Sequence, residues 1–234
     1  IGLGTIVDDD GPPSLSINDV TVTEGNSGTT DATFTVALAA VSGQPVTVSA
    51  AASNETATAG SDYVATGLTP LTIPPGQTTA TFLVPVNGDT LDEANETFTV
   101  TLAGPVNATI GDGIGLGTIT DDDATPSLSI NDVSVTERNA GATNAAFTVT
   151  LSAVSGQSVA ASAATSNGTA TAGSDYVATG PAALTIPAGQ TTATFTVPVN
   201  GDTLDEANET FLVTLASTVN ATISHATRPA DGAA

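Results

Sequence analysis

Apolar residues alternate with threonine, alanine and other small or polar residues along most of this chain. The clearest runs are Phe34, Val36 and Leu38, then Phe82, Val84 and Val86, then Phe98, Val100 and Leu102. Alternation with a period of two is typical of strands that bury one face. Pro-Pro-Gly-Gln at 74–77 and Ser-Gly-Gln at 42–44 have the composition of turns, and no segment has a helical period. The pattern predicts about seven short strands in each hundred or so residues, as in an antiparallel β-sandwich.

The pattern occurs twice, at a fixed offset of 113 residues. The repeated segments are 14–20 and 127–133, 60–63 and 173–176, and 88–98 and 201–211. A period of this length corresponds to a whole domain and not to one turn of a solenoid. We therefore expect two tandem sandwiches, domain 1 over residues 11–123 and domain 2 over residues 124–223.

The two ends of the chain do not follow this repeat. Residues 1–10 match residues 114–123, the last predicted strand of domain 1, at nine of ten positions. Domain 2 follows domain 1 as far as Ile223 and then departs into a tail at 224–234. The sequence thus predicts an all-β protein with an extra N-terminal strand at 1–10 and a second sandwich that lacks its last strand.

Composition removes several classes of function. The 234 residues include 24 Asp and Glu but only two Lys and Arg, for a formal net charge of −22. Such a polyanion is repelled by nucleic acid and by anionic membrane surfaces. No apolar run reaches the roughly 18–20 residues that membrane insertion requires. With no cysteine, no lysine and a single histidine, His225, in the tail, we expect no enzyme, and paired acids without an aromatic sugar platform do not favour a glycosidase.

The acids recur in the predicted loops, which a sandwich can gather at one end. Several carboxylates in one place favour a hard divalent cation, because calcium takes six to eight oxygen ligands in flexible geometry. Zinc normally uses histidine or cysteine, which these loops lack. The alternative is an acidic end that is simply solvated.

Four segments carry a resemblance to a known family. They are Val-Thr-Val-Thr-Glu-Gly at 20–25, Thr-Ala-Thr-Ala-Gly-Ser-Asp-Tyr at 56–63, Asp-Thr-Leu-Asp-Glu-Ala-Asn-Glu-Thr-Phe at 89–98, and Thr-Ile-Thr-Asp-Asp-Asp at 118–123. In this order they resemble the Calx-beta domain, which implies immunoglobulin-like sandwiches that bind calcium. In domain 1 the resemblance implies the ligands Glu24, Asp62, Asp89, Glu93, Glu96, Asp121, Asp122 and Asp123. In domain 2 it implies Glu137, Asp175, Asp202, Glu206 and Glu209.

The sequence departs from the family pattern in two ways. Gly88 stands where the exchanger domains of the family have a second acid before the position of Asp89. Domain 2 has no Asp triplet of its own, so Asp8, Asp9 and Asp10 of another chain would have to complete its site.

The extra strand suggests donor-strand complementation, in which one molecule completes the sheet of the next. We expect Ile1, Leu3 and Ile6 to enter the open second sandwich of another copy. The link to residue 14 spans at most about 14 Å, whereas each sandwich is roughly 35–45 Å long, so the strand cannot return to its own second domain. This predicts an extracellular or cell-surface homopolymer, head to tail, with calcium stiffening the junctions.

Two rival functions remain from the sequence. The chain can be a calcium-binding repeat module cut from a larger surface adhesin or matrix protein, in which case residues 1–10 end a preceding repeat. A calcium sensor would need a coupled effector domain, and none is recognisable in these residues.

Overall fold

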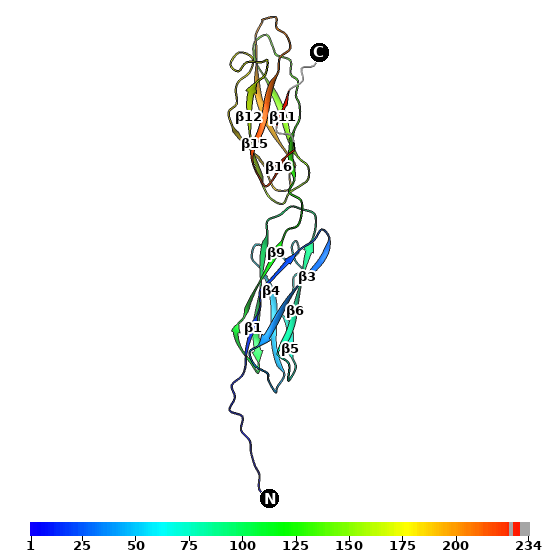
Figure 1. Ribbon diagram of the computed structural model, residues 1–234, viewed down its shortest axis with the longest axis vertical. Helices are drawn as coiled ribbons and strands as arrows, with labels where there is room; N and C mark the ends of the chain where they lie inside the picture. Colours follow the sequence, from blue (N-terminus) through cyan, green and yellow to red (C-terminus); the bar gives the residue numbers. More distant parts are fainter. Residues whose placement is uncertain (225–226, 230–234) are drawn as a thin grey trace. The chain divides into compact units, whose positions relative to one another are not determined.

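The computed structural model describes residues 1–224 and 227–229 (Figure 1). His225, the single histidine of the tail, lies outside the described residues. Every regular element among them is a β-strand, and none of the described residues forms a helix that could cross a membrane. Contacts divide the chain into two compact units: unit 1 contains residues 1–90 and 94–122, and unit 2 contains residues 91–93 and 123–234.

Unit 1 is a sandwich of two sheets. One sheet has the strand order β6-β3-β1-β8 and the other has the order β2-β9-β7-β4-β5. The strands are β1 (Ser14–Ile17), β2 (Val20–Thr23), β3 (Gly28–Leu38), β4 (Val46–Asn54), β5 (Thr69–Ile73), β6 (Thr79–Gly88), β7 (Glu96–Val106), β8 (Thr109–Asp112) and β9 (Ile114–Thr120). The expected all-β sandwich is confirmed, with nine strands in this unit where the period-two pattern predicted about seven.

The core of unit 1 follows directly from this alternation. Phe34 on β3 faces Phe82 on β6 in the sheet register, and both rings are buried. The Tyr63 ring stacks on Phe98 with centroids 4.8 Å apart, and its hydroxyl donates a hydrogen bond of 2.6 Å to Asn54 Oδ1. Burial raises the pKa of Tyr63. This tyrosine is a packing residue, and its one polar atom is satisfied inside the core.

Unit 2 repeats the arrangement. Its sheets have the orders β14-β11-β10-β16 and β13-β12-β15-β17. The strands are β10 (Ser127–Ile130), β11 (Gly141–Leu151), β12 (Val159–Asn167), β13 (Ala182–Ile186), β14 (Thr192–Gly201), β15 (Phe211–Val219), β16 (Thr222–Ile223) and β17 (Thr227–Pro229). Tyr176 stacks on Phe211 at 4.7 Å and donates to Asn167 Oδ1 at 2.7 Å, as its counterpart does in unit 1.

The two units differ at the last strand. In unit 1, β9 lies between β7 and β2, antiparallel to β7 and parallel to β2. In unit 2, the three-residue strand β17 pairs with β15, and Thr214 faces Thr227 as Thr101 faces Ile114. Residues 133–136, the counterpart of β2, do not form a strand. The described part of the tail, residues 227–229, therefore lies at the start of the position that β9 fills in unit 1.

The side chains of β9 alternate between the core and the outer face. Ile119 is 3% exposed, whereas Leu116 is 40% exposed and Ile114 is 60% exposed. The other inward positions are glycines, and a Cβ at Gly117 would overlap the ring of Phe98. Because Phe98 lies directly under this strand, the inward face of β9 has room for glycines followed by one isoleucine.

Candidate metal centres

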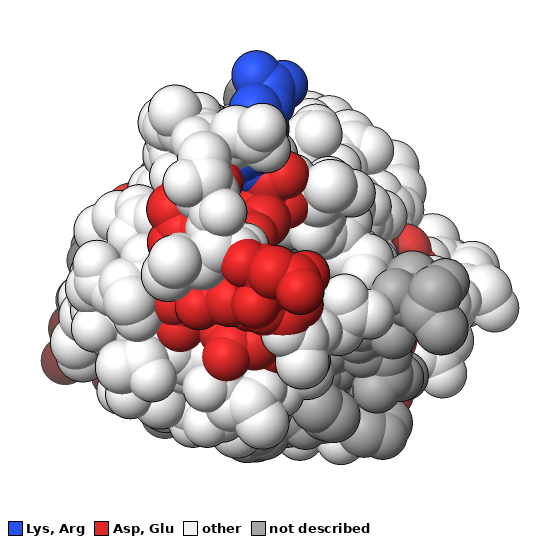
Figure 2. Space-filling view, turned by 90° about the horizontal axis from the view of Figure 1, so that it is seen from above, with Lys and Arg blue, Asp and Glu red and all other residues white. Residues whose placement is uncertain are grey.

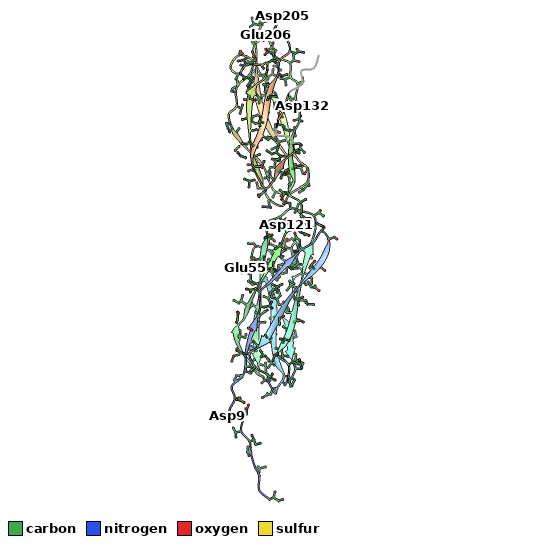
Figure 3. All side chains as sticks on the ribbon, viewed as in Figure 1. Asp9, Glu55, Asp121, Asp132, Asp205 and Glu206 are labelled. Carbon is green, nitrogen blue, oxygen red and sulfur yellow. The ribbon has the colours of Figure 1, made fainter. Side chains whose placement is uncertain are left out.

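Unit 1 brings three of the predicted ligands together. Glu24 directly follows β2 and Asp121 directly follows β9. These strands are parallel neighbours, so both acids leave the sheet at the same edge. Carboxylate oxygens of Glu24, Asp121 and Asp123 all lie within 4.8 Å of one another, and Glu24 is only 5% exposed. Figure 3 marks Asp121 at this end of the strand.

The backbone around this group is held by short polar contacts. The Gly25 N–H donates to Asp122 Oδ1 at 3.0 Å, and the Asp121 N–H donates to Asn95 Oδ1 at 3.1 Å. Asp122, a predicted ligand, thus caps a backbone N–H beside the group. The sequence analysis did not single out Asn95 as a site residue, although Asn95 lies in the segment 88–98 that the second repeat contains unchanged.

Asp62 and its counterpart Asp175 hold local turns. Asp62 Oδ2 accepts the Thr58 N–H at 2.6 Å, and Asp175 Oδ2 accepts the Thr171 N–H at the same distance. Such bonds satisfy backbone N–H groups in a tight turn. The other predicted ligands of domain 1 lie outside the group of three described above: they are Asp89, Glu93 and Glu96. Glu93 belongs to the segment 91–93, which groups with unit 2.

Unit 2 has a different group of three. Carboxylate oxygens of Glu137, Asp202 and Glu206 lie within 4.8 Å of one another, and all three residues are exposed. Figure 2 shows acidic side chains gathered in one patch, and Figure 3 labels Glu206 at the end of this unit. The counterparts of Asp202 and Glu206 in domain 1 are Asp89 and Glu93, so the two repeats assemble different subsets of the predicted ligands.

The surroundings of this second group shift the pKa values of Glu206 and of its neighbours Glu209 and Asp175. Desolvation raises the pKa of Glu206, and the charges of Asp202, Asp175 and Glu137 raise it further. Desolvation likewise raises the pKa of Glu209, helped by its hydrogen bond to Asp175. The Thr171 N–H lowers the pKa of Asp175. Glu206 and Glu209 therefore resist ionisation without a cation, and a bound cation would reverse that effect.

The donor set of both groups is oxygen only. Carboxylates suit calcium or magnesium, and calcium accepts an irregular set of oxygen ligands more readily than magnesium, which requires an octahedron. The predicted ligands Asp8, Asp9 and Asp10 are exposed on the N-terminal segment and join neither group.

The position of the missing second acid has a steric explanation. A Cβ at Gly88 would overlap the carbonyl oxygen of Gly25, and a Cβ at Gly201 would overlap that of Arg138. Any side chain at these positions would push apart the two loops that carry the acids. The departure from the family pattern is therefore built into the backbone of both units.

An open groove lies beside the acids of unit 2. It has a volume of about 320 Å³ and is lined by residues 133–137 together with residues of the β11, β14 and β15 strands. Its apolar lining includes Val133, Val135, Ala145, Ala170, Val199 and Phe211, and its acidic lining includes Glu137, Asp175, Glu206 and Glu209.

These features define a tandem β-sandwich module with a candidate cation site in each repeat. The family model of the Calx-beta domain matches residues 8–117 and 120–233. The chain belongs to the Calx-beta domain family, and the resemblance seen in the sequence is confirmed.

Solved structures give more distant matches. CBD12 from CALX1.2 is 20% identical, with 88% of this chain and 80% of that chain covered and a TM-score of 0.44. The apo-form Calx CBD1 domain is 24% identical, with 47% of this chain and 99% of that chain covered and a TM-score of 0.42. A search of curated proteins finds no significant match.

Proposed function

We propose that this protein is a non-enzymatic, calcium-binding structural module of the cell surface or extracellular space. The two groups of three carboxylates carry this proposal, because each offers only hard oxygen ligands within 4.8 Å. The exposure of the second group favours weak binding, in the range of about 0.1–1 mM that extracellular calcium modules use. At such concentrations a net charge of −22 supplies further attraction for the cation.

Calcium binding is tested by titration calorimetry of the full chain, with magnesium as the control cation. Glu24→Gln removes one ligand from the group in unit 1, and Glu137→Gln is the matched change in unit 2. Each variant is expected to remove or weaken one class of sites and leave the other. An unaltered calcium isotherm in both variants would contradict the proposed ligands.

The finer function that we propose is assembly. Copies of the chain join head to tail into a filament, each giving its N-terminal strand to unit 2 of the next, and calcium stiffens the junctions. The observation that supports this is the open groove of unit 2 together with residues 1–10, which nearly repeat the strand that fills unit 1. A heterologous contact of this kind propagates and does not close into a dimer.

A second function is favoured by the same repeat. Residues 1–10 also correspond to the end of a preceding Calx-beta repeat, as expected for a calcium-binding module within a larger surface adhesin or matrix protein. The two functions differ in what the isolated chain does.

Negative-stain electron microscopy and sedimentation velocity in about 1 mM calcium separate these functions. Thin filaments that shorten or dissolve on chelation are expected from the assembly function. Monomers at every concentration would exclude it and favour the adhesin or matrix module.

A further inference from the structure

We propose that strand β13 of unit 2 pairs antiparallel with β13 of a second copy of this chain, across a two-fold axis at Leu184. The contact joins the β13-β12-β15-β17 sheets of the two copies edge to edge. It goes beyond the proposed function, because it needs neither calcium nor the N-terminal segment.

Strand β13 (Ala182–Ile186) lies at the edge of its sheet. It pairs with β12 on one side and is the first strand in the order β13-β12-β15-β17. The last described strand, β17, pairs with β15 at the opposite edge of the sheet. Ala183 and Thr185 are exposed, whereas Ile186 is buried. The outer side of an edge strand presents N–H and C=O groups that can pair with another chain.

The register of the matching strand in unit 1 shows which backbone groups of β13 point outward. A proline within an edge strand is confined to positions whose nitrogen faces solvent, because it has no N–H to donate to the ladder. In unit 1, β5 has Pro70 opposite Ser49, and in unit 2 Ala183 lies opposite Ser162 at the same register position. The N–H and C=O of Ala183 therefore face away from β12, and those of Thr185, two residues further on, do so too.

The edge of unit 1 has a proline where the edge of unit 2 has an N–H donor. Strand β5 reads Thr-Pro-Leu-Thr-Ile, whereas β13 reads Ala-Ala-Leu-Thr-Ile. Proline on an edge strand is one of the devices that prevent association between strands of different molecules. In unit 2 the nearest prolines, Pro181 and Pro187, lie just outside the strand. Of these two equivalent edges, β13 is therefore the one that can accept another strand.

The two flanking prolines select the register. Pro181 and Pro187 stand three residues before and three residues after Leu184. With a two-fold axis at Leu184, Ala183 of each copy faces Thr185 of the other, and each such pair exchanges two N–H···O=C bonds. A shift of two residues would place a proline opposite Ala183 or Thr185, whose carbonyl group would then have no N–H to accept from. The centred register is the one in which every outward carbonyl group of β13 has a donor.

The distribution of charge allows two copies to approach each other at this edge. A net charge of −22 on each copy causes general repulsion. Residues 176–201, however, contain no Asp, Glu, Lys or Arg, and they include β13 and β14, which contact each other. Added salt screens the repulsion between distant acids and takes nothing from a neutral contact. We therefore expect the pairing to strengthen as the ionic strength rises.

The side chains of β13 fit this two-fold contact. Leu184 is partly buried against the core of unit 2. At the axis it lies opposite Leu184 of the second copy, in a pair of residues without mutual hydrogen bonds, where side chains are closest. Ala183 and Thr185 face each other on the solvent side. A strand of five residues gives a small interface, so the pairing is weak and reversible.

The first test is sedimentation equilibrium of the full chain in a calcium chelator, at concentrations up to about 1 mM. The unaltered chain should show a monomer–dimer equilibrium that is stronger in about 1 M than in about 0.15 M sodium chloride. Ala183→Pro should lower the association constant at least about tenfold, because it removes one N–H donor from each copy. The fold should be kept, since β5 has a proline at this register position.

Ala183→Val is the matched control for this test. It changes the same exposed residue but keeps its N–H, so the chain should associate within about threefold of the unaltered protein. Monomers of the unaltered chain at every concentration would overturn the inference. Equal association of the Ala183→Pro and Ala183→Val chains would place the contact elsewhere, for example on β14, and would also overturn it.

A second test moves the open edge to unit 1. Pro70→Ala is added to the Ala183→Pro chain, which gives β5 the outward N–H that β13 has lost. The segment 63–88 around β5 also contains no charged side chain. The double variant should regain association to within about tenfold of the unaltered chain. If it stays as weakly associated as Ala183→Pro alone, then the proline does not decide which edge pairs, and the inference fails.

A third test fixes the register by disulfide trapping, for which a chain without cysteine is suited. Leu184→Cys places two thiols across the axis, on Cα atoms about 4.5 Å apart, within the range of a disulfide. Thr185→Cys is the matched control, because its two copies lie diagonally, at about 7–8 Å. The first variant should form a covalent dimer on oxidation and the second should not. Equal yields, or a dimer of the second variant alone, would contradict the register.

The outcomes separate this inference from the proposed function. A dimer in chelator and no filaments in calcium would support the pairing and contradict the proposed assembly. Filaments in calcium from a chain that stays monomeric in chelator would support the assembly and contradict the pairing.

Discussion

Replacing Ile119 by alanine tests whether the last strand closes the core of a unit. The side chain is 3% exposed in β9, whereas Ile6, the matching residue of the unpaired segment, is 99% exposed. Burying an isoleucine from full exposure contributes about 1.5–3 kcal/mol, and truncation adds the cavity that is left behind. We expect Ile119→Ala to lower the free energy of unfolding of unit 1 by about 2–4 kcal/mol.

The measurement uses the tyrosines as reporters. The chain has two tyrosines and no tryptophan, and one tyrosine lies in each unit. In a Tyr176→Phe background, the fluorescence of Tyr63 follows urea unfolding of unit 1 alone. The thermal midpoint of that unit should fall by roughly 10 °C or more.

Leu116→Ala is the matched control on the same strand. Leu116 is 40% exposed on the outer face, so its truncation should destabilise unit 1 by less than about 1 kcal/mol. If the two variants lose similar stability, then the inward face of β9 does not close the core. In that case the proposal that unit 2 needs a donated strand would also lose its physical basis.

Four further results are expected. Calcium binding to unit 2 should weaken as the pH falls through the raised pKa values of Glu206 and Glu209, because protonated carboxylates do not coordinate calcium. Titration calorimetry across this pH range measures the affinity, and a constant affinity would refute this expectation. Without calcium, the free energy of unfolding of unit 2 should instead fall as the pH rises above about 4.5. The reason is that the raised pKa values make the folded unit bind more protons than the unfolded chain in this range. Thermal melts at several pH values measure this. Restoring the family acid by Gly88→Asp should destabilise unit 1 without tightening calcium, because its Cβ would overlap the Gly25 carbonyl, and a gain in affinity would argue against this. Tyr176→Phe alone should destabilise unit 2 by only about 0.5–1.5 kcal/mol in urea unfolding, the usual net value of one hydrogen bond.

The arrangement of the candidate sites was only partly predictable. The repeated acids marked the loops, and Glu24 and Asp121 do lie together. That they meet depends on the parallel pairing of β2 with β9, two segments almost one hundred residues apart. In unit 2 this pairing is absent among the described residues, and a different set of acids gathers there. The sequence showed that domain 2 lacks the Asp triplet and cannot form the group of unit 1, but it did not show that Asp202 and Glu206 gather with Glu137 instead.

The sequence by itself determined the strands, the two repeats and the family, because alternation of side chains is a local property and the offset of 113 residues is a property of the chain. It also contained the glycines at 2 and 4, although not the reason for them. Only the tertiary structure showed that a glycine must lie over Phe98, that Ile119 and not Leu116 faces the core, and that the matching position in unit 2 is a groove. These facts depend on which strand packs beside which, and that is decided by contacts between residues far apart in the chain.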